Sequence, residues 1–577
     1  MPMHFSPWFK VFLSGVGFWS DAYDLFIINI VGAIMKQPHM FPIDPDGDPA
    51  LIPKPGFNGS CVAGADMLPA TRCETNPAFT AMGYIKTAAL VGAILGQLIF
   101  GALADKLGRR VIFICTISMV IIGAIGSALV QGSPEDGGIY VQLTIFRFLL
   151  GFGVGGEYPL SATVSSESST TEDRGSAVSN VFAMQGWGNV TAGLVAWALL
   201  AAGVDHHITW RVCLGFGAVP GLATVYWRFM MEETEQFKHT EEEDDLEERL
   251  LVEGPGLLDM TPSPKVPAVE DAMEGEGGRV PRTGSVAAGA PHAPSHGGGC
   301  CGYLRNTGAI LYQFRYLLLG TAGAWFIFDV TFYANGLFSD TVFKMISPDA
   351  TITDVAADNL YTALLGLPGY YLGVYFIDRM GRRAMQIFGF SAVGITFLIM
   401  AGLLEPLQEH AIPVLVILYG LTFLFANWGP NTTTYVIPSE VFPTRARATC
   451  HGISAASGKL GAVVGSYGIG AMEALGKAGT AKGAMNTLGL RFVLVACGII
   501  SIIGTVWSMA FTPNMEGVSM EDIDNGAALG MLAGPRAVAP DAHGTVEMEG
   551  SDHEFHSATG KPAAAATASG ANGTFTY

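Results

Sequence analysis

The chain contains twelve apolar stretches, each about as long as the ~20 residues that cross the hydrocarbon core of a bilayer. Six stretches precede residue 232 and six follow residue 310. Their approximate bounds are 9–35, 80–104, 110–131, 138–163, 177–202, 210–231, 312–338, 356–377, 384–404, 411–437, 449–475 and 490–512. Because a helix satisfies its own backbone hydrogen bonds in lipid, this pattern predicts an all-α membrane protein with twelve transmembrane helices.

The composition also favours a membrane protein over a soluble one. Only 14% of the 577 residues are charged and 50% are hydrophobic, whereas a soluble protein carries about 25% charged residues. The formal net charge of −19 excludes a strongly basic nucleic-acid binder. Eight cysteines in a chain of this length are too few for a disulfide scaffold.

Two polar segments carry most of the negative charge. Residues 232–306 hold 16 Asp/Glu against 6 Lys/Arg, and residues 513–577 hold 9 against 2. Neither segment has enough apolar residues to fold alone. We therefore predict a six-helix bundle at 1–231, an acidic, mostly disordered linker at 232–310, a second six-helix bundle at 311–512 and a disordered tail from 513 to 577. The linker and the tail, both expected in the cytoplasm, are candidate sites for regulatory partners.

Basic residues in the short loops predict the orientation of the chain. The loops after the second, eighth and tenth stretches contain several, whereas the loops after the third and ninth contain none. The basic residues are Lys106, Arg109, Arg110, Arg379, Arg382, Arg383, Arg445 and Arg447. We expect these loops and both termini to be cytoplasmic.

The first loop on the opposite side, about 36 to 78, has features of an oxidising compartment. Asn58 begins an Asn-Gly-Ser sequon, and Cys61 and Cys73 lie in the same loop. A glycan on Asn58 and a Cys61–Cys73 disulfide would both suit an extracellular face. Two unpaired thiols are the alternative.

The chain contains an internal repeat. The segment Gly101-Ala-Leu-Ala-Asp-Lys-Leu-Gly-Arg-Arg110 recurs as Gly373-Val-Tyr-Phe-Ile-Asp-Arg-Met-Gly-Arg-Arg383. Three pairs of residues share one offset of 273 positions, and these pairs are Asp105 and Asp378, Glu167 and Glu440, and Arg174 and Arg447. Agreement at one offset indicates that the two halves are copies of each other.

Two parallel six-helix halves with Asp-x-x-Gly-Arg-Arg after the second helix of each resemble the major facilitator superfamily. The resemblance implies two pseudo-symmetric bundles that rock about a binding site near the bilayer midplane. It implies a gating role at the cytoplasmic ends for Asp105, Arg109, Arg110, Asp378, Arg382, Arg383, Glu167, Arg174, Glu440 and Arg447. Asp105 would cap a helix or pair with an arginine, and Glu167–Arg174 and Glu440–Arg447 would form clamps present in only one state. The alternative is that these charges only determine topology.

We single out six of the charged residues that lie inside the apolar stretches. They are Asp21, Asp24, Arg147, Glu157, Asp329 and Lys459. A charged side chain at the centre of a membrane helix costs about 3 kcal/mol on insertion scales, so each one is a candidate functional residue. Four acids and two bases are more than structure alone requires.

Neutral hydrogen-bonding side chains accompany these charges. They are Tyr158, Gln185, Trp325, Tyr333, Asn427 and Asn431. Trp325, Asp329 and Tyr333 recur every four residues and so form one stripe on a helix. With an acid at its centre, the stripe predicts the wall of a polar cavity. Such donors suit dihydrogen phosphate, whose hydroxyl groups an Asp accepts, whereas sulfate has no proton to donate.

Six segments resemble the phosphate:H+ symporters of fungi and plants. They are Ser20-Asp-Ala-Tyr-Asp-Leu-Phe26, Gly155-Gly-Glu-Tyr-Pro-Leu-Ser-Ala-Thr163, Phe182-Ala-Met-Gln-Gly186, Trp325-Phe-x-x-Asp-x-x-Phe-Tyr333, Gly429-Pro-Asn-Thr-Thr-Thr434 and His451-Gly-Ile-Ser-Ala-Ala-Ser-Gly-Lys459. By this resemblance, phosphate is bound by Tyr158, Gln185, Trp325, Asp329, Tyr333, Asn431 and Lys459. Proton coupling falls to Asp21, Asp24, Glu157 and Arg147.

The chain departs from that family at two places. Glu157 stands where the family commonly has Asp, so the acid is kept on a longer side chain. Glu232-Glu233-Thr234 stands where the family often has Pro-Glu-Thr.

We therefore expect a secondary active transporter in the plasma membrane that takes up inorganic phosphate with protons by alternating access. Three alternatives are Na+ in place of H+, another anion or a sugar as substrate, and a phosphate-sensing receptor without net transport. No nucleophile–base pair, phosphate-cradling loop or metal-ligand cluster stands out, so we expect no enzyme activity, cofactor or metal. The expected partners are phosphate, protons, the lipid bilayer and regulatory proteins at the linker and the tail, and we expect no nucleic acid.

Overall fold

The computed structural model describes residues 5–36, 51–53, 73–75, 77–132, 138–242, 308–337, 351–469, 487–514 and 518–524. Helices make up most of these residues, and two short strands, β1 (Leu51–Pro53) and β2 (Cys73–Thr75), pair antiparallel. Asn58 and Cys61 lie outside the described residues, and of Cys73 only the backbone is described. The glycan and the disulfide therefore stay predictions, as do the disordered linker and tail.

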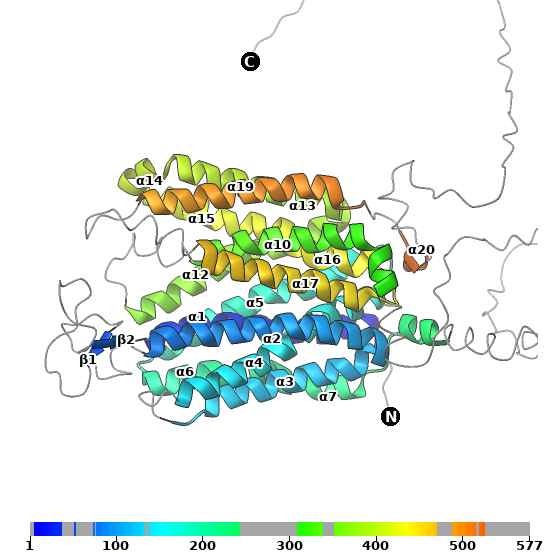
Figure 1. Ribbon diagram of the computed structural model, residues 1–577, viewed down its shortest axis with the longest axis horizontal. Coiled ribbons are helices and arrows are strands. Elements are labelled where there is room, and N and C mark those ends of the chain that lie inside the picture. Colours follow the sequence, from blue (N-terminus) through cyan, green and yellow to red (C-terminus); the bar gives the residue numbers. More distant parts are fainter. Residues whose placement is uncertain are drawn as a thin grey trace, which may run out of the picture. The chain divides into compact units, whose positions relative to one another are not determined.

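The first half of the chain contributes six spans. They are α1 (Pro7–Met35), α2 (Pro77–Leu107), α3 (Arg109–Leu129), α4 (Gly138–Glu167), α5 (Arg174–Ala201), and α6 (His206–Phe216) continued by α7 (Ala218–Met230). These helices run alongside one another, and Figure 1 shows them grouped in the lower part of the view. We refer to α1 through α7 as the first bundle.

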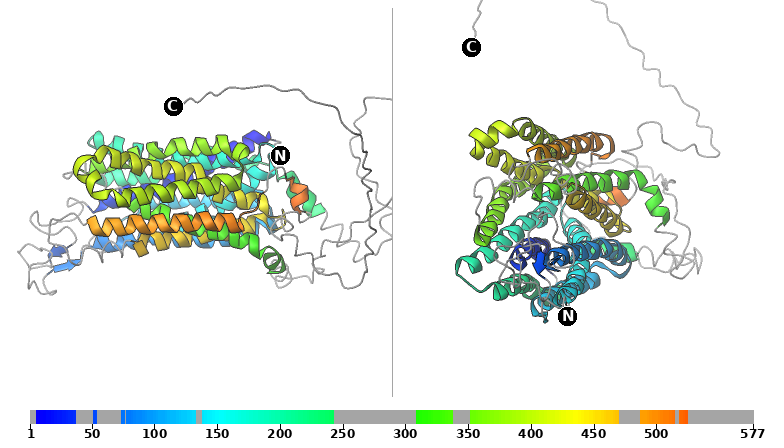
Figure 2. Two further views of the ribbon diagram at one scale, coloured as in Figure 1. Left: turned by 90° about the horizontal axis from the view of Figure 1, so that it is seen from above. Right: turned by 60° about the vertical axis from the view of Figure 1, so that its left-hand side comes forward.

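The second half contributes six more spans, which we call the second bundle. They are α10 (Arg315–Leu337), α12 (Ile352–Met380), α13 (Arg382–Gly402), α15 (Ile412–Ala426) continued by η3 (Asn427–Asn431) and α16 (Thr432–Val441), α17 (Arg447–Val463) continued by η4 (Val464–Ile469), and α19 (Thr487–Phe511). Two short helices, α14 (Leu404–His410) and α20 (Met520–Asp524), lie at span ends. The turned views in Figure 2 separate the two bundles by colour.

Ten helices in the described part of the chain are long and apolar enough to cross a membrane. The two remaining spans, α5 and α17, are rich in Gly, Ser and other polar residues. Both lie at the contact between the bundles, where α5 packs against α12 and α17 packs against α2. Because another helix covers much of their surface, these two spans need less apolar surface than a lipid-facing helix.

Glycines allow the close approach between the bundles. A Cβ atom on Gly101 of α2 would lie 2.6 Å from the carbonyl oxygen of Ala448 in α17. A Cβ atom on Gly193 of α5 would lie 2.8 Å from the Cα of Leu360 in α12. The two bundles therefore meet backbone against backbone, as small residues permit in membrane proteins.

Two spans are interrupted next to polar side chains. The sixth span breaks at Gly217, whose carbonyl oxygen accepts a hydrogen bond of 2.7 Å from the Ser20 hydroxyl group. The tenth span contains the π-helical segment η3, with non-helical backbone at Gly429 followed by Pro430. Such interruptions are common at functional sites in helices, and this one carries Asn427 and Asn431.

The repeated motif has the same backbone conformation in both bundles. Gly108 and Gly381 lie 273 positions apart and have φ angles of 89° and 81°. Their ψ angles are 153° and 146°, a region that only glycine adopts readily. Each glycine precedes the first residue of a helix, α3 or α13, and turns the chain sharply from the preceding span.

We predict that Gly108→Ala destabilises the protein by about 2 kcal/mol, the usual cost of placing a side chain in this backbone region. The new Cβ atom would also lie 2.4 Å from Oε2 of Glu233. The measurement is the thermal unfolding midpoint in detergent. The matched control is Gly83→Ala inside α2, where a Cβ atom would meet nothing within 4 Å, and which gains up to about 1 kcal/mol from helix propensity. Equal midpoints for the two variants would contradict the prediction.

Candidate functional site

The stripe predicted on the seventh span lies on α10 and faces α17. Trp325 and Asp329 are buried, and Tyr333 is half-buried. Trp325 rests on Gly458 of α17, where a Cβ atom would lie 2.3 Å from the indole Cδ1. The glycine therefore lets the indole ring reach the inside of the bundle. The next residue on α17 is Lys459.

Lys459 joins the stripe to a tyrosine of the first bundle. Its Nζ atom lies 3.6 Å from Oδ2 of Asp329 and donates a hydrogen bond of 3.2 Å to the hydroxyl group of Tyr333. The same ammonium group lies 5.1 Å from the centre of the Tyr158 ring on α4. We call Tyr158, Trp325, Asp329, Tyr333 and Lys459 the ammonium cluster. It brings together five of the seven residues that the resemblance assigns to phosphate.

The other two predicted phosphate residues lie on α5 and η3. The side-chain amide of Asn431 donates to Asn427 Oδ1 at 2.7 Å and to the Tyr370 hydroxyl group at 3.4 Å. Gln185 is buried, and its side-chain oxygen has no hydrogen-bond partner among the described residues. No hydrogen bond in the described part of the chain joins Gln185 or Asn431 to the ammonium cluster. Their role in binding phosphate therefore stays a prediction.

The acids of the first bundle lie on α1 and α4. Both carboxylate oxygens of Asp21 are buried and lack a hydrogen-bond partner among the described residues. Asp24 lies one turn further along α1, with its Oδ1 atom 4.0 Å from Nη1 of Arg147. That guanidinium group also donates to the backbone oxygen of Asp24 at 3.1 Å. Asp24 therefore has a loosely placed counter-ion.

Glu157 has a different and tighter environment. Nη1 of Arg228 on α7 lies 2.7 Å from Oε1 and 2.9 Å from Oε2 of Glu157. The hydroxyl group of Thr116 on α3 donates to Oε1 at 2.5 Å. Arg147 and Glu157, which both lie on α4, therefore have separate partners. Arg228 lies within a predicted span and was not among the expected site residues; its position three residues before the end of that span was the available signal.

Aromatic rings connect the acids to the ammonium cluster. Tyr158 packs against Phe18 of α1 with ring centres 4.7 Å apart and against Trp325 at 6.5 Å. Tyr435 of α16 packs against Phe18 at 5.0 Å and against Phe182 of α5 at 4.8 Å. Rings from both bundles therefore fill the space between the spans beside the site.

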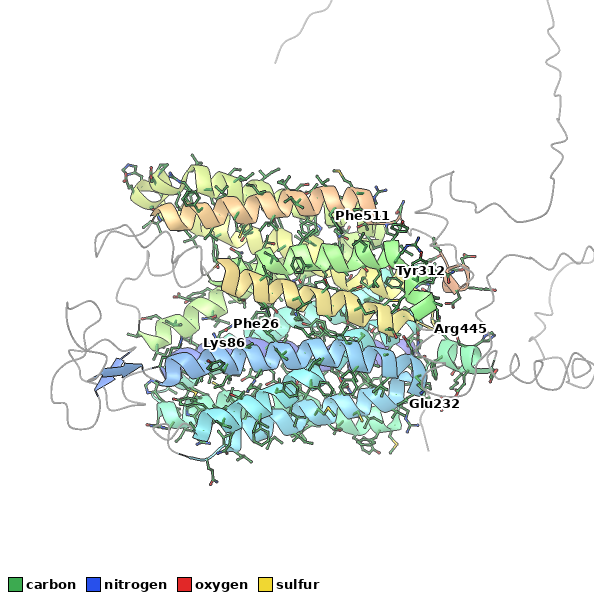
Figure 3. All side chains as sticks on the ribbon, viewed as in Figure 1. Phe26, Lys86, Glu232, Tyr312, Arg445 and Phe511 are labelled. Carbon is green, nitrogen blue, oxygen red and sulfur yellow. The ribbon has the colours of Figure 1, made fainter. Side chains whose placement is uncertain are left out.

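A charged network joins the bundles where α2 meets α3, which we call the Arg109 end of the helices. The Nη2 atom of Arg109 lies 3.0 Å from Oε1 of Glu167 and 3.3 Å from Oδ1 of Asp105. Nη1 of Arg447, from the second bundle, lies 3.0 Å from the same Glu167 oxygen. One carboxylate therefore binds two guanidinium groups, one from each bundle. Figure 3 labels Glu232 and Arg445 at this end as well.

The second bundle repeats the contacts that Arg109 makes with two carboxylates of the first bundle. Nε and Nη2 of Arg382 each lie 2.8 Å from Glu440, and Nη2 lies 2.9 Å from Asp378. The second arginine of each motif also has an equivalent partner: Arg110 donates to the backbone oxygen of Phe229, and Arg383 to that of Met509.

Each motif aspartate also binds the first turn of a helix in the opposite bundle. Asp105 accepts hydrogen bonds from the backbone amides of Ala448 and Thr449 and from the Thr449 hydroxyl group, at 3.2, 2.7 and 2.7 Å. Asp378 accepts from the backbone amide of Ser176 at 2.8 Å and from its hydroxyl group. A carboxylate is favourable at the N-terminus of a helix, because unpaired amides and the helix dipole meet there. Asp105 thus caps a helix and pairs with an arginine at once.

The predicted clamps have different partners from those expected. Glu167 pairs with Arg109 and Arg447 rather than with Arg174, and Glu440 pairs with Arg382 rather than with Arg447. Arg174 instead donates to the backbone oxygen of Val518 at 3.3 Å. The expected pairs lie seven residues apart across a helix–helix turn, which directs their side chains to different neighbours. The segment Glu232-Glu233-Thr234, which departs from the family pattern, contacts the start of α3. Glu233 accepts hydrogen bonds from the backbone amides of Arg109 and Arg110.

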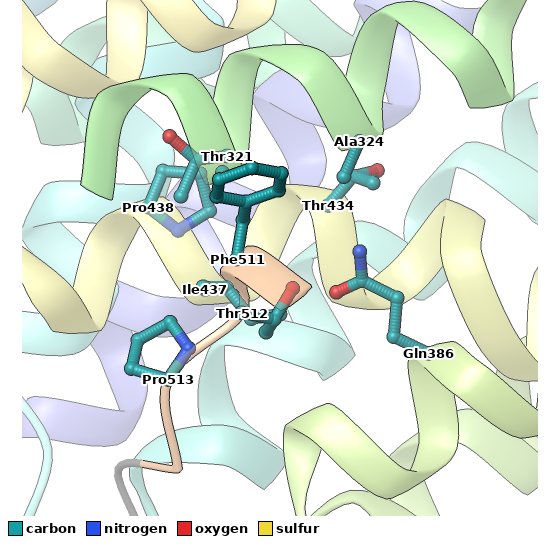
Figure 4. Close-up of a pocket in the computed structure, with 10 residues that line it drawn as sticks. Thr321, Ala324, Gln386, Thr434, Ile437, Pro438, Phe511, Thr512 and Pro513 are labelled. Atoms are coloured by element: carbon teal, nitrogen blue, oxygen red, sulfur yellow. The ribbon is translucent and has the colours of Figure 1, made fainter. Parts of the chain in front are cut away.

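A small pocket lies in the second bundle, apart from the ammonium cluster. Thr321, Gln386, Thr434 and Phe511 are among its lining residues, and none of the lining side chains is charged (Figure 4). Such a pocket has neither the cation nor the acid that a hydrogen phosphate ion needs. We therefore take the ammonium cluster, not this pocket, as the candidate substrate site.

This chain is similar to known transporters along most of its length. A family profile described as "Sugar (and other) transporter" matches residues 13–527. The chain is 32% identical to "Low affinity inorganic phosphate transporter 3" of Petunia hybrida, covering 89% of this chain and 91% of that protein. It is 34% identical to "Probable inorganic phosphate transporter 1-6" of Arabidopsis thaliana, covering 89% and 92%.

The fold is also that of a solved transporter. The proton:xylose symporter XylE bound to 6-bromo-6-deoxy-D-glucose superposes with a TM-score of 0.62 at 16% identity, covering 90% of this chain and 98% of XylE. XylE belongs to the major facilitator superfamily. The predicted fold of two six-helix bundles is therefore confirmed.

We predict that Glu167→Gln lowers phosphate uptake about tenfold and stability by about 3 kcal/mol, because Arg109 and Arg447 then lose the buried carboxylate that both of them contact. The measurements are uptake into proteoliposomes and the unfolding midpoint. Glu172→Gln is the matched control, because Glu172 is an exposed acid in the loop between α4 and α5. Wild-type behaviour of both variants would show that the network does not stabilise this state.

Proposed function

The chain belongs to the Sugar (and other) transporter family of the major facilitator superfamily, and on that basis we propose that it takes up inorganic phosphate with protons by alternating access. Relatives at 32% and 34% identity, covering about nine-tenths of the chain, are named as inorganic phosphate transporters. The family profile and these relatives are described as transporters, which supports the proposal that this chain is a carrier and not an enzyme.

The ammonium cluster is the observation that supports phosphate most directly. An ammonium group, two phenols and an indole N–H donate hydrogen bonds, and one carboxylate accepts them. A partly protonated oxyanion satisfies both kinds of group at once. A neutral sugar would leave Lys459 and Asp329 paired only with each other, and sulfate would present a second negative charge to Asp329 without a proton to donate.

The position of the cluster supports alternating access. Tyr158 belongs to the first bundle, whereas Asp329, Tyr333 and Lys459 belong to the second. The Arg109 end of the helices is closed by the charged network that joins the bundles. A substrate held between two bundles is released when that network opens and the opposite ends close.

Proton coupling is proposed to involve the acids of the first bundle, Asp21, Asp24 and Glu157, with Arg147 as the partner of Asp24. A carboxyl group that loses water or its counter-ion binds a proton more readily. Those of these acids that bind a proton would cross the closed state as neutral groups, so the proton gradient supplies the work of accumulation. We propose the plasma membrane as the location, with both termini cytoplasmic, as the basic residues of the short loops indicate.

Asp329→Asn is expected to reduce phosphate uptake at least about tenfold, because a neutral amide no longer balances Lys459 or accepts from the phosphate hydroxyl as strongly. Uptake by the wild-type protein is expected to be faster at about pH 5 than at about pH 8, since protons are co-substrates. The measurement is radiolabelled phosphate flux into proteoliposomes with and without Na+.

The matched control is Glu409→Gln, because Glu409 is an exposed acid that lies 3.7 Å from the exposed His410 ring. This variant should transport as the wild type does. Wild-type uptake by correctly inserted Asp329→Asn protein would contradict the site. Flux that requires Na+ would favour the sodium-coupled alternative, and saturable binding without accumulation would favour a receptor.

A further inference from the structure

Arg228 forms a fully enclosed ion pair with Glu157 in the first bundle. The residue has no exposed surface, and its guanidinium group lies 3.8 Å from the centre of the Phe113 ring. Its Nη1 atom contacts both oxygens of Glu157, and it also donates to the backbone oxygen of Phe113 at 3.3 Å. Side chains from α3, α4 and α7 therefore meet at one point inside the bundle.

The backbone of α1 leaves room for this ion pair at Gly17. Nη2 of Arg228 donates to the backbone oxygen of Leu13 at 3.4 Å. A Cβ atom on Gly17 would lie 1.9 Å from that Nη2 atom and 2.7 Å from Oε2 of Glu157. Any residue larger than glycine at this position would displace the guanidinium group, so the pair fits against α1 only because Gly17 has no side chain.

Asp21 lies on the same helix, one turn beyond Gly17. Unlike Glu157, it is not bound by a cation in the described part of the chain. Its two carboxylate oxygens have no hydrogen-bond partner among the described residues, although the side chain is fully buried. The ionisable groups that surround it are Asp24 on α1, Glu157 on α4, Arg228 on α7 and the Tyr435 phenol on α16. The one cation in this set is already bound to Glu157 through two oxygens.

We propose that Arg228 is a positioning residue that keeps Glu157 permanently charged, so that Glu157 does not exchange the transported proton. This inference rests on proton-coupled phosphate transport and narrows the set of coupling acids. Protonation of Glu157 would leave the guanidinium group of Arg228 buried without a counter-ion, which is strongly unfavourable. Asp21 has no such partner to lose, and Asp24 has only the looser contact with Arg147.

The length of Glu157 is suited to this role. Both carboxylate oxygens reach Nη1 of Arg228, and Oε1 also accepts from Thr116. An aspartate on the same backbone would be shorter by one methylene group, so it could not keep all these contacts without movement of α4 or α7. The longer side chain of Glu157 therefore holds Arg228 in place, which an aspartate at this position would not do.

The experiment uses full-length protein in proteoliposomes and two assays. Accumulation of phosphate driven by a pH gradient requires proton coupling, whereas phosphate counterflow at equal pH requires only binding and rocking. The variants are Glu157→Gln, Arg228→Gln, Arg228→Lys and the double variant Glu157→Gln/Arg228→Gln, with Asp21→Asn alongside.

Each neutral single variant of the pair is expected to lose accumulation about tenfold, whereas the double variant, which removes both charges together, stays within about threefold of the wild type. Arg228→Lys keeps a counter-ion and should retain the wild-type pH profile of counterflow. In Arg228→Gln the unpaired Glu157 should add a pH-dependent step to counterflow, and the double variant should lack it. A purely structural role would not produce that difference in pH profile.

The inference is overturned if the double variant keeps counterflow but loses accumulation, because Glu157 would then carry the proton. If the double variant does not insert, the pH profiles of Arg228→Gln and Arg228→Lys decide, and identical profiles overturn it. Asp21→Asn should lower gradient-driven accumulation and keep counterflow. Failure of the wild type in both assays would instead contradict the proposed function.

Discussion

Lipid offers no hydrogen bond and no counter-ion, and the arrangement of this protein follows from that constraint. Five buried cations of the described spans lie within 4.0 Å of a carboxylate, and these are Arg109, Arg147, Arg228, Arg447 and Lys459. At the Arg109 end the contacts are tight, as in the 3.0 Å contacts of Arg109 and Arg447 with Glu167. Deeper in the bundles, Lys459 and Asp329 are 3.6 Å apart. Tight pairs stabilise one state of the protein, and the looser pair leaves capacity for a ligand.

The duplicated motif explains how two bundles are joined by few residues. Asp105 and Asp378 occupy equivalent positions, and each binds the first turn of a helix in the other bundle. Ser166 and Ser439 are also 273 positions apart, and the Ser166 hydroxyl group donates a hydrogen bond to the backbone oxygen of Ser439 between the bundles. The equivalence is incomplete at Arg174 and Arg447, since only Arg447 pairs with a glutamate across the interface. The two ends of the network are therefore chemically different, although the backbones are copies.

The sequence predicts the spans and the candidate site residues better than it predicts their partners. The number of helices, the repeat and the stripe of Trp325, Asp329 and Tyr333 rest on local features, such as apolar length and spacing along one helix. The partners of Glu167 depend on how two bundles meet, which no spacing within one segment contains. Arg228 lies near the end of a span, where an arginine usually extends to the interface, so its burial against Gly17 could be seen only in three dimensions. The non-helical backbone of η3 follows from Gly429 and Pro430, but the hydrogen bond that it allows between Asn431 and Asn427 does not.

Adjacent residues of α4 connect the ion pair beside Asp21 to the proposed phosphate site. Consecutive side chains on a helix point about 100° apart. Glu157 accordingly faces Arg228 inside the first bundle, while Tyr158 faces Lys459 of the second bundle. Because the ion pair ties α4 to α3, α7 and the backbone of α1, a rotation of α4 that releases Tyr158 from Lys459 must also move the surroundings of Asp21. A fixed charge at Glu157 thus has a mechanical use, since it makes the helix that contacts the substrate site move together with the helix that carries the unpaired acid.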